Sequence, residues 1–288
     1  MKRVLFLSGK GGTGKTSLAG AFASLMREKV LADCDVDAAN LHLLLDPSVV
    51  AEGDYEGSSA AMRDARRCTA CGRCREACRF QAIDEAFEID PYLCEGCGAC
   101  AYVCPEGAIA LSPQVSGHWI QAETRLGPLA SAELVPGEET SGKLVSHVKE
   151  KAQELAASKH IERVVVDGAP GIGCPVIASV TGVDVVILVT EPSLSGLHDL
   201  ERALGVVRHF QVPAYLVINR ADLSSELASQ TRAFAKESAL PVLGEIPFDP
   251  AVTRAMIAGR SVVEDGDGPA NDAFRRIYER FKEAVKDG

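Results

Sequence analysis

The chain has 288 residues, of which 47% are apolar and 24% are charged, and its formal net charge is −10. This composition is typical of a folded protein with room for one α/β domain and a small second domain. The acidic balance and the scattered Lys and Arg residues argue against nucleic acid as a partner.

We expect no signal peptide and no stable membrane insertion. The apolar run at 4–7 ends at once in a glycine-rich turn, which is not the pattern of a signal peptide. No apolar stretch approaches the roughly 20 residues that span a bilayer. We therefore expect a cytoplasmic protein, in which ten cysteines favour metal ligation or redox chemistry over disulfides.

The first elements are a strand at 4–7, a glycine-rich turn at 8–14 and a helix from Lys15 to about Met26. The turn fits the P-loop pattern G-x-x-x-x-G-K-T, in which backbone N–H groups cradle phosphates. Lys15 is expected to reach the β- and γ-phosphates, and the Thr16 hydroxyl to ligate Mg²⁺. A glycine turn with a coincidental lysine is the alternative, and the flanking strand and helix disfavour it. The residues expected to bind nucleotide here are Gly9, Gly11, Gly12, Thr13, Gly14, Lys15, Thr16 and Ser17.

A second short strand at 30–32 runs into an acidic cluster of Asp33, Asp35 and Asp37. From about residue 58 long aliphatic runs vanish, and eight cysteines fall between Cys68 and Cys104. This change of composition marks residues 58–112 as a domain inserted into a larger one.

The cysteines of the insert form two runs with the spacing C-x₂-C-x₂-C-x₃-C, and Pro105 follows the second run. In bacterial ferredoxins such runs hold two [4Fe–4S] clusters, and the fourth cysteine of each run serves the other cluster. Zinc is the alternative, but its ligands usually come as two separated pairs. Arg79 stands where the second run has its proline, which relaxes the turn without changing the number of ligands. We assign one cluster to Cys68, Cys71, Cys74 and Cys104, and the other to Cys78, Cys94, Cys97 and Cys100.

After a poorly patterned stretch that begins near residue 113, a helix is predicted at 141–157. Apolar strands follow at 164–167, 185–189, 215–218 and 242–246, with helical segments between them. Continuous β-branched runs separated by helices indicate a parallel sheet covered on both faces. We therefore predict a doubly wound, mostly parallel α/β domain at 1–57 and 113–288, interrupted by the small α+β insert.

The last helix carries an apolar stripe beside several basic residues. Phe274, Ile277 and Phe281 follow helical spacing. An amphipathic membrane-binding helix is one interpretation. Acidic residues on its polar face favour the other, a helix docked on the sheet.

The motif from Lys10 to Thr16, Lys-Gly-Gly-Thr-Gly-Lys-Thr, resembles the deviant P-loop of the MinD/Mrp/ParA ATPases, a group that includes the nitrogenase iron protein. The resemblance implies that Lys10 crosses to the nucleotide of a partner subunit, so that ATP joins a dimer. A second cation there would stabilise charge that develops during phosphoryl transfer. The dimer would be formed by two copies of this chain or with a similar ATPase.

The same resemblance implies roles for residues further along the chain. Asp35 matches the aspartate that orients the attacking water, and Asp167 the aspartate near Mg²⁺. Asp33 and Asp37 are weaker candidates, for which capping of a turn is an equal alternative. The adenine contacts implied are Asn219, Arg220, Pro247 and Asp249.

Two cysteines, Cys34 and Cys174, lie outside the insert. A buried structural role is the common one for such residues. Cys174 follows Asp167 at the offset of a cluster-ligating cysteine in the nitrogenase iron protein. We therefore hypothesise that Cys174 faces a dimer axis and binds metal or exchanges a thiol there.

The leading functional hypothesis is a slow ATPase whose nucleotide-driven dimer gates electron transfer through two [4Fe–4S] clusters. The acceptor would be a partner metalloprotein or a metallocofactor under assembly. One alternative is an iron–sulfur cluster carrier of the Mrp type, although eight cysteines in ferredoxin spacing form closed sites. The other is a redox-sensing switch that recruits a partner when ATP is bound.

Overall fold

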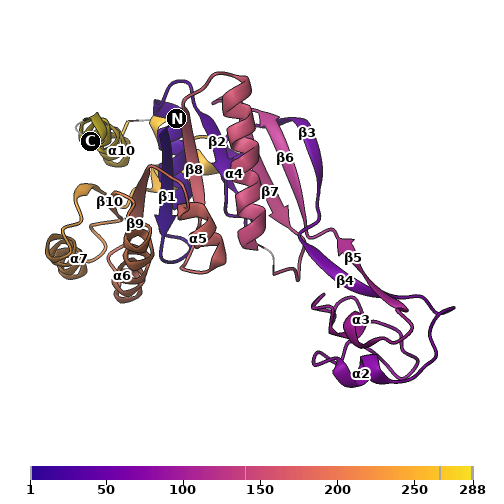
Figure 1. The fold of residues 1–288 in the computed structure, drawn as a ribbon. Helices are drawn as coiled ribbons and strands as arrows, with labels where there is room; N and C mark the ends of the chain where they lie inside the picture. The colour runs from indigo at the N-terminus through magenta and orange to yellow at the C-terminus, as the bar shows by residue number, and fades with distance from the viewer. Residues whose placement is uncertain (1, 140, 266, 287–288) are drawn as a thin grey trace. The chain divides into compact units, whose positions relative to one another are not determined.

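The computed structural model describes residues 2–139, 141–265 and 267–286 (Figure 1). The chain divides into two compact units. The first comprises residues 1–52, 119–133 and 141–288, and the second comprises residues 53–118 and 134–140.

A nine-stranded sheet forms the centre of the first unit, with the strand order β11-β10-β9-β1-β8-β2-β7-β6-β3. Every recorded register from β11 through β7 is parallel. All six residues of β9 are buried, as a continuous aliphatic run requires when both faces of a sheet are covered. The mostly parallel α/β fold predicted from the sequence is confirmed. The strands are β1 (Lys2–Ser8), β2 (Val30–Asp33), β3 (Ser48–Tyr55), β6 (Gly117–Glu123), β7 (Leu129–Leu134), β8 (Arg163–Pro170), β9 (Val185–Thr190), β10 (Ala214–Asn219) and β11 (Val242–Ile246).

Helices cover both faces of this sheet. Val4 and Phe6 of β1 belong to a core cluster with residues of α1, α8, α9 and α10, and Leu5 is fully buried on the opposite face. Helices α4, α5 and α6 pack against β2, β8 and β9. The helices are α1 (Lys15–Leu25), the 3₁₀ turn η1 (Leu41–Leu44), α4 (Ser141–Ser158), α5 (Cys174–Val180), α6 (Leu194–His209), α7 (Ser225–Glu237), α8 (Pro250–Ile257), α9 (Val262–Asp265) and α10 (Pro269–Lys286).

The apolar stripe of α10 is docked into the core of this unit. Phe274, Ile277 and Phe281 are at most 4% exposed. Phe281 meets Phe22 of α1 edge to face, with ring centroids 5.3 Å apart, a favoured arrangement for aromatic pairs. No helix in the described part of the chain is both long and apolar enough to cross a membrane.

Two strands, β6 and β7, lie where the sequence shows no clear pattern. β7 pairs in parallel with β2, so that Leu31 lies beside Leu129 and Asp33 beside Ser131. Its buried residues include Ala130, Ser131 and Ala132, small side chains with weak strand propensity. The strand was not predicted because most of its buried side chains are small, and it lacks the β-branched residues that indicate a strand.

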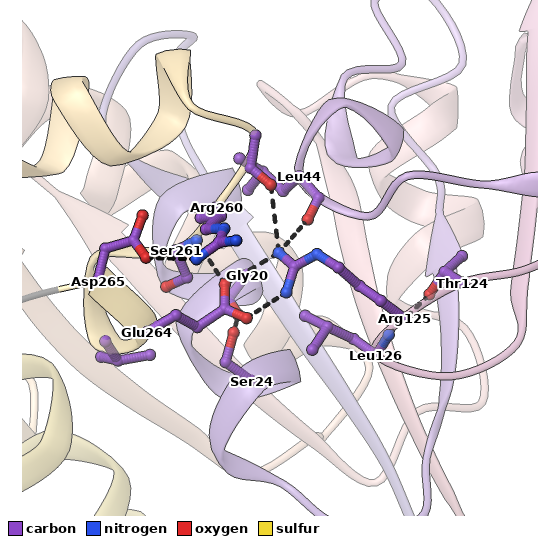
Figure 2. Close-up of polar contacts among 12 residues, drawn as sticks. Gly20, Ser24, Leu44, Thr124, Arg125, Leu126, Arg260, Ser261, Glu264 and Asp265 are labelled. Carbon is purple, nitrogen blue, oxygen red and sulfur yellow. Dashed lines mark hydrogen bonds and ion pairs between the residues drawn. The ribbon is translucent and has the colours of Figure 1, made fainter.

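The turn between β6 and β7 is fixed by a polar cluster centred on Arg125 (Figure 2). The guanidinium forms an ion pair with Glu264 of α9 and donates a 2.6 Å hydrogen bond to the carbonyl of Leu44. Ser24 of α1 also bonds to Glu264, and these contacts outweigh burial and lower the pKa of that carboxyl. The cluster therefore links helix α1, which follows the P-loop, to η1 and α9.

The second unit is small and contains two short strands and two short helices. Strands β4 (Ser58–Arg63) and β5 (Ile109–Gln114) pair antiparallel, and the helices are α2 (Arg73–Ala77) and α3 (Ala99–Val103). The second unit extends beyond the predicted insert of 58–112 because Ser116 forms hydrogen bonds with residues that precede it and residues that follow it in the sequence. Its N–H donates to Tyr55, and its carbonyl accepts from Val135, which brings in the segment 134–140.

An internal repeat with an offset of 26 residues runs through the second unit, as the pair Cys68 and Cys94 illustrates. Helices α2 and α3 are each preceded by a glycine in the left-handed region, Gly72 with φ +82° and Gly98 with φ +76°. The backbone therefore repeats as well as the cysteine spacing. Positive φ angles recur at the same offset in Ala70 and Gly96, in Gly72 and Gly98, and in Gln81 and Gly107.

Candidate functional site

The P-loop connects β1 to α1, and β1 lies between β8 and β9 in the sheet. The carboxyl ends of these parallel strands place their following residues at one edge, where open α/β sheets bind ligands. The loop runs close to its neighbours. A Cβ at Gly9 would lie 2.3 Å from the carbonyl oxygen of Asp199, and one at Gly14, where φ is +92°, would lie 2.2 Å from Nδ2 of Asn219. Only glycine fits both positions.

Lys15 and Thr16 open helix α1, and both contact Asp167 within β8. Lys15 Nζ lies 2.6 Å from one carboxylate oxygen of Asp167, and the Thr16 hydroxyl donates a 2.7 Å bond to the other. Lys15 Nζ also lies 3.5 Å from Asp35. Burial works to lower the pKa of Lys15, but the charges of Asp167 and Asp35 outweigh it and raise that pKa. The group therefore combines a buried cation with hydroxyl and carboxylate oxygens, the ligands that Mg²⁺ prefers.

The acidic cluster after β2 separates into three environments. Asp33 is fully buried and accepts backbone N–H groups from Asp35, Asn40 and Leu41. Burial and the neighbouring Asp167 raise the pKa of Asp33 to about 7. Asp33 therefore fixes the turn after β2, which is the capping role named above as the alternative to a catalytic one.

Asp35 and Asp37 differ in exposure. The Asp35 side chain is 10% exposed beside Lys15, and burial raises its pKa while Lys15 opposes that shift. Asp37 is exposed. Of the three aspartates, Asp35 is thus the one whose carboxylate lies at the P-loop lysine and remains partly accessible to solvent.

Lys10 does not join this group within its own chain. Its ammonium lies 2.8 Å from Glu191 and donates hydrogen bonds to the hydroxyls of Ser193 at 3.1 Å and Ser195 at 2.9 Å. These three residues were missed by sequence reasoning. The available signal was that Glu191 directly follows β9, which is a neighbour of β1 in the sheet.

The implied adenine contacts lie in two places. Asn219 donates a 2.7 Å hydrogen bond to the carbonyl of Thr13 in the P-loop, and Arg220 forms a 3.0 Å ion pair with Glu191. Asp249 accepts a 2.8 Å hydrogen bond from the N–H of Ala251 and caps α8.

The remaining members of the predicted nucleotide set have their own contacts. Pro247 follows β11, and the neighbouring Phe248 is 52% exposed. Ser17 contacts the sulfur of Met256 in α8 at 3.1 Å. The Thr13 hydroxyl is buried and has no hydrogen-bond partner within the described residues. Asn219 is therefore the implied adenine contact that touches the P-loop itself.

The eight cysteines of the second unit line two separate cavities, which we call the first and second cysteine sites. Each takes three thiols from one run and one from the other. The first cysteine site is lined by Cys68, Cys71, Cys74 and Cys104, together with Phe87, Glu106 and Ile109. The second cysteine site is lined by Cys78, Cys94, Cys97 and Cys100, together with Ala61, Ile89 and Glu95.

Backbone amides point at the sulfurs in both sites. Ala108 N–H donates to Cys104 Sγ at 3.2 Å, and Ala61 N–H donates to Cys94 Sγ at 3.3 Å. At the first site, the backbone at Ala70 and then the Arg63 guanidinium lower the pKa of the Cys68 thiol. In the described chain no three His, Cys, Asp or Glu side chains converge on the position of one ion.

The two cysteines outside the second unit differ from each other. Cys34 is fully buried, and burial raises its pKa far above the ordinary value. Cys174 is exposed at the start of α5, so close to Gly142 that a Cβ there would lie 3.0 Å from the Cys174 Cβ. Cys34 therefore has the environment of a packing residue, and the role of Cys174 remains a hypothesis.

Comparisons with known proteins bear on the family and the fold of the chain. Residues 4–262 match the family described as the CobQ/CobB/MinD/ParA nucleotide binding domain. An uncharacterized protein of Methanocaldococcus jannaschii is 32% identical over 98% of this chain and 97% of its own length. An iron–sulfur cluster carrier protein of Pyrococcus abyssi is 27% identical over 44% of this chain and 47% of its own. The septum site-determining protein MinD of Pyrococcus horikoshii, solved with Mg-ADP, shares the fold with a TM-score of 0.61 at 18% identity, covering 99% of this chain and 97% of that one.

Proposed function

The chain belongs to the family of CobQ/CobB/MinD/ParA nucleotide-binding domains, and from this premise we propose that it couples ATP binding and hydrolysis to electron transfer through two [4Fe–4S] clusters. The observation that carries the proposal is the composition of the two cysteine sites, each with three thiols from one run and one from the other. The acceptor would be a partner metalloprotein or a metallocofactor under assembly.

At the nucleotide site, Lys15 would exchange its carboxylate partners for the β- and γ-phosphates of ATP. Thr16 and Asp167, which already share a hydrogen bond, would hold Mg²⁺ directly and through water. Bound Mg²⁺ would neutralise charge on the phosphates. Asp35 would orient the attacking water, since its carboxylate lies beside Lys15 and is partly exposed. Asn219 and the loop after β11 would contact the adenine.

Completion of the site requires a second subunit, either another copy of this chain or a similar ATPase. Lys10 is held within its own chain by Glu191 and two serines. In the dimer it would leave them and donate to the nucleotide of the partner. A cation placed where charge develops lowers the barrier to phosphoryl transfer. Nucleotide binding and subunit contact would thereby become one event.

The residues of the two cysteine sites fit [4Fe–4S] clusters. Thiols from both runs surround each cavity, and backbone N–H groups already point at Cys94 and Cys104, the kind of bond that tunes a cluster potential. A cubane is encircled by its four thiolates, so its ligands need not converge on one ion as zinc ligands do. Bound clusters would supply one-electron redox chemistry.

The test is anaerobic reconstitution followed by iron and acid-labile sulfide analysis. Wild-type protein should bind about eight iron atoms per chain, and Cys71→Ser and Cys97→Ser should each lose about half. Cys174→Ser is the matched control, since this thiol lies outside both sites. Zinc without sulfide in wild-type protein would refute the proposal. Loss of iron in the control would instead support a metal-binding role for Cys174.

A cluster carrier is the second candidate, and the partial similarity to iron–sulfur cluster carrier proteins favours it. A carrier releases its cluster to an apo-protein, whereas an electron carrier retains it through repeated reduction and oxidation. Incubation with an apo-ferredoxin as acceptor separates the two functions. ATP-dependent transfer of iron and sulfide would support the carrier. Retention of both clusters with neither transfer nor electron flow would leave the redox-sensing switch.

A further inference from the structure

We propose that Arg63, assisted by Arg67, makes the two cysteine sites electrochemically unequal, with the higher reduction potential at the first cysteine site. The inference rests on the proposed function, because it presupposes that both sites hold a cluster. It concerns a difference between two sites that the repeated cysteine spacing alone would make equivalent.

The internal repeat identifies the counterpart of Arg63. Arg63 of β4 pairs with Ile109, and Ile89 pairs antiparallel with Ile83. Ile83 and Ile109 are related by the 26-residue offset, and the same offset relates Arg63 to Ile89. Arg63 therefore occupies, beside the first site, the position that Ile89 occupies in the lining of the second site.

Arg63 is well placed to act on the first site. Its side chain is 14% exposed, and its Nε is buried without a hydrogen-bond partner among the described residues. Arg63 of β4 pairs with Ile109 of β5, which lines the first cysteine site together with Cys68. Besides the backbone at Ala70, the Arg63 guanidinium helps to lower the pKa of the Cys68 thiol. It also forms an ion pair with Glu88, whose side chain is 68% exposed. The carboxylate is thus largely in solvent, while the cation is mostly enclosed next to the thiol.

Arg67, an exposed residue, adds a second cation next to Glu106 in the lining of the first site. It donates a 2.6 Å hydrogen bond to the carbonyl of Glu106, two residues after the ligand candidate Cys104. Its counterpart at the 26-residue offset is Leu93, which is uncharged and 50% exposed. Arg63 and Arg67 therefore both lie beside the first site, and neither has a charged counterpart beside the second.

The acidic residues in the linings of the two sites are balanced. Each site has one glutamate in its lining, Glu106 in the first and Glu95 in the second. Reduction adds one negative charge to a cluster, and a neighbouring cation stabilises that charge, most strongly where solvent is largely excluded, as at Arg63. Since Arg63 and Arg67 have no charged counterparts, the first site should be reduced more easily.

The experiment is an EPR-monitored redox titration of the reconstituted full chain under anaerobic conditions. The wild-type protein should show two one-electron waves whose reduction equilibrium constants differ at least tenfold, which corresponds to about 59 mV. Arg63→Gln should lower the upper wave and leave the lower wave in place. Arg66→Gln is the matched control, because that side chain is 93% exposed on the same segment, and it should move neither wave.

A second variant keeps the inference testable if Arg63→Gln does not fold. Glu88→Gln removes the exposed partner of Arg63, so it should raise the upper wave only. Coincident waves in a protein that contains about eight iron atoms and matching sulfide would overturn the inference. A shift of the lower wave in either variant would also overturn it. Absence of iron and sulfide from the wild-type protein would instead refute the proposed function.

Discussion

The two units of this chain prepare their sites in different ways. In the nucleotide-binding unit a nine-stranded sheet and its helices bury a large apolar core, and Lys15, Thr16 and Asp167 lie at the edge of that scaffold. In the cysteine-rich unit the core cluster is small. Its buried members are Ala61, Cys74, Ile83, Cys100 and Ile109, so two of the five are candidate ligands.

This difference indicates where each unit obtains its stability. A sheet with a large apolar core folds without its ligand, and the buried ion pairs of Lys15 hold the site in place. A unit of about 70 residues with few apolar side chains usually needs disulfides, metals or a partner. For such units the free energy of metal binding is also free energy of folding.

The first expected effect is therefore on the cysteine-rich unit when clusters are absent. Amides within 58–114 should lose most of their protection from hydrogen exchange in iron-free protein, by about tenfold or more, because their core includes unliganded thiols. Amides of β1, β8 and β9 serve as the internal control and should keep theirs. Full protection of 58–114 without iron would show that the unit folds on its own apolar core.

Catalysis by Lys10 across the subunit interface predicts complementation between two inactive variants. Lys10→Ala and Asp35→Asn should each reduce ATP hydrolysis about 10²- to 10³-fold, because each removes a group that acts in the transition state. In a mixed dimer one site would regain both groups. An equal mixture should therefore recover about one quarter of the wild-type rate if subunits pair at random.

If Lys10 acted on the nucleotide of its own chain, no site in the mixed dimer would have both groups. The rate of the mixture would then stay at the level of the separate variants. Lys15→Ala mixed with Asp35→Asn is the control. Both of those residues belong to the same chain's site, so this mixture should stay inactive.

Asp249 has two candidate roles, as the cap of helix α8 and as a contact to the bound nucleotide. Its bond to the N–H of Ala251 caps α8, so Asp249→Ala should lower the free energy of unfolding by about 1 kcal/mol. Ser224→Ala is the matched control, because Ser224 caps α7 through the N–H of Leu227. If the Asp249 carboxylate also contacts the adenine as proposed, the affinity for ATP, measured by calorimetry, should fall in Asp249→Ala and stay unchanged in Ser224→Ala. Weaker binding in Asp249→Ala alone would identify this carboxylate as a nucleotide contact.

The smallest expected effect concerns the ion pair that retains Lys10. Glu191→Gln should favour the ATP-bound dimer about two- to fivefold, since a partly exposed ion pair contributes less than about 1 kcal/mol. Sedimentation velocity with a non-hydrolysable ATP analogue measures this equilibrium. Glu245→Gln on β11 breaks an exposed ion pair with Arg232 of α7 and should have no effect. A weaker dimer in Glu191→Gln would mean that Glu191 itself contacts the partner subunit.

The sequence predicts the parts of this molecule whose signals are local. The strand at 242–246 agrees with β11 at both ends, and the predicted helix at 141–157 agrees with α4 to within one residue. A glycine-rich turn between an apolar strand and a helix likewise placed Lys15 at the start of α1. Strong periodicity and P-loop chemistry need no tertiary context.

The remaining features depend on tertiary contacts. β7 was missed because three of its four buried residues are alanine or serine, which form a strand here only through pairing with β2. The partners of Lys10 were missed because Glu191 lies far from it in sequence and meets it only through the neighbouring strands β1 and β9. The difference between the two sites at Arg63 likewise becomes visible only when the repeat identifies Ile89 as its equivalent position.

The most direct test of nucleotide-coupled redox chemistry is the reduction potential of the two cysteine sites with and without Mg²⁺ and a non-hydrolysable ATP analogue. We expect nucleotide to shift at least one potential by about 60 mV, which corresponds to about 1.4 kcal/mol of coupling for a one-electron couple. Lys15→Ala protein should show no shift, because it lacks the phosphate-binding cation. Potentials that are identical with and without nucleotide in fully loaded wild-type protein would contradict the proposed coupling.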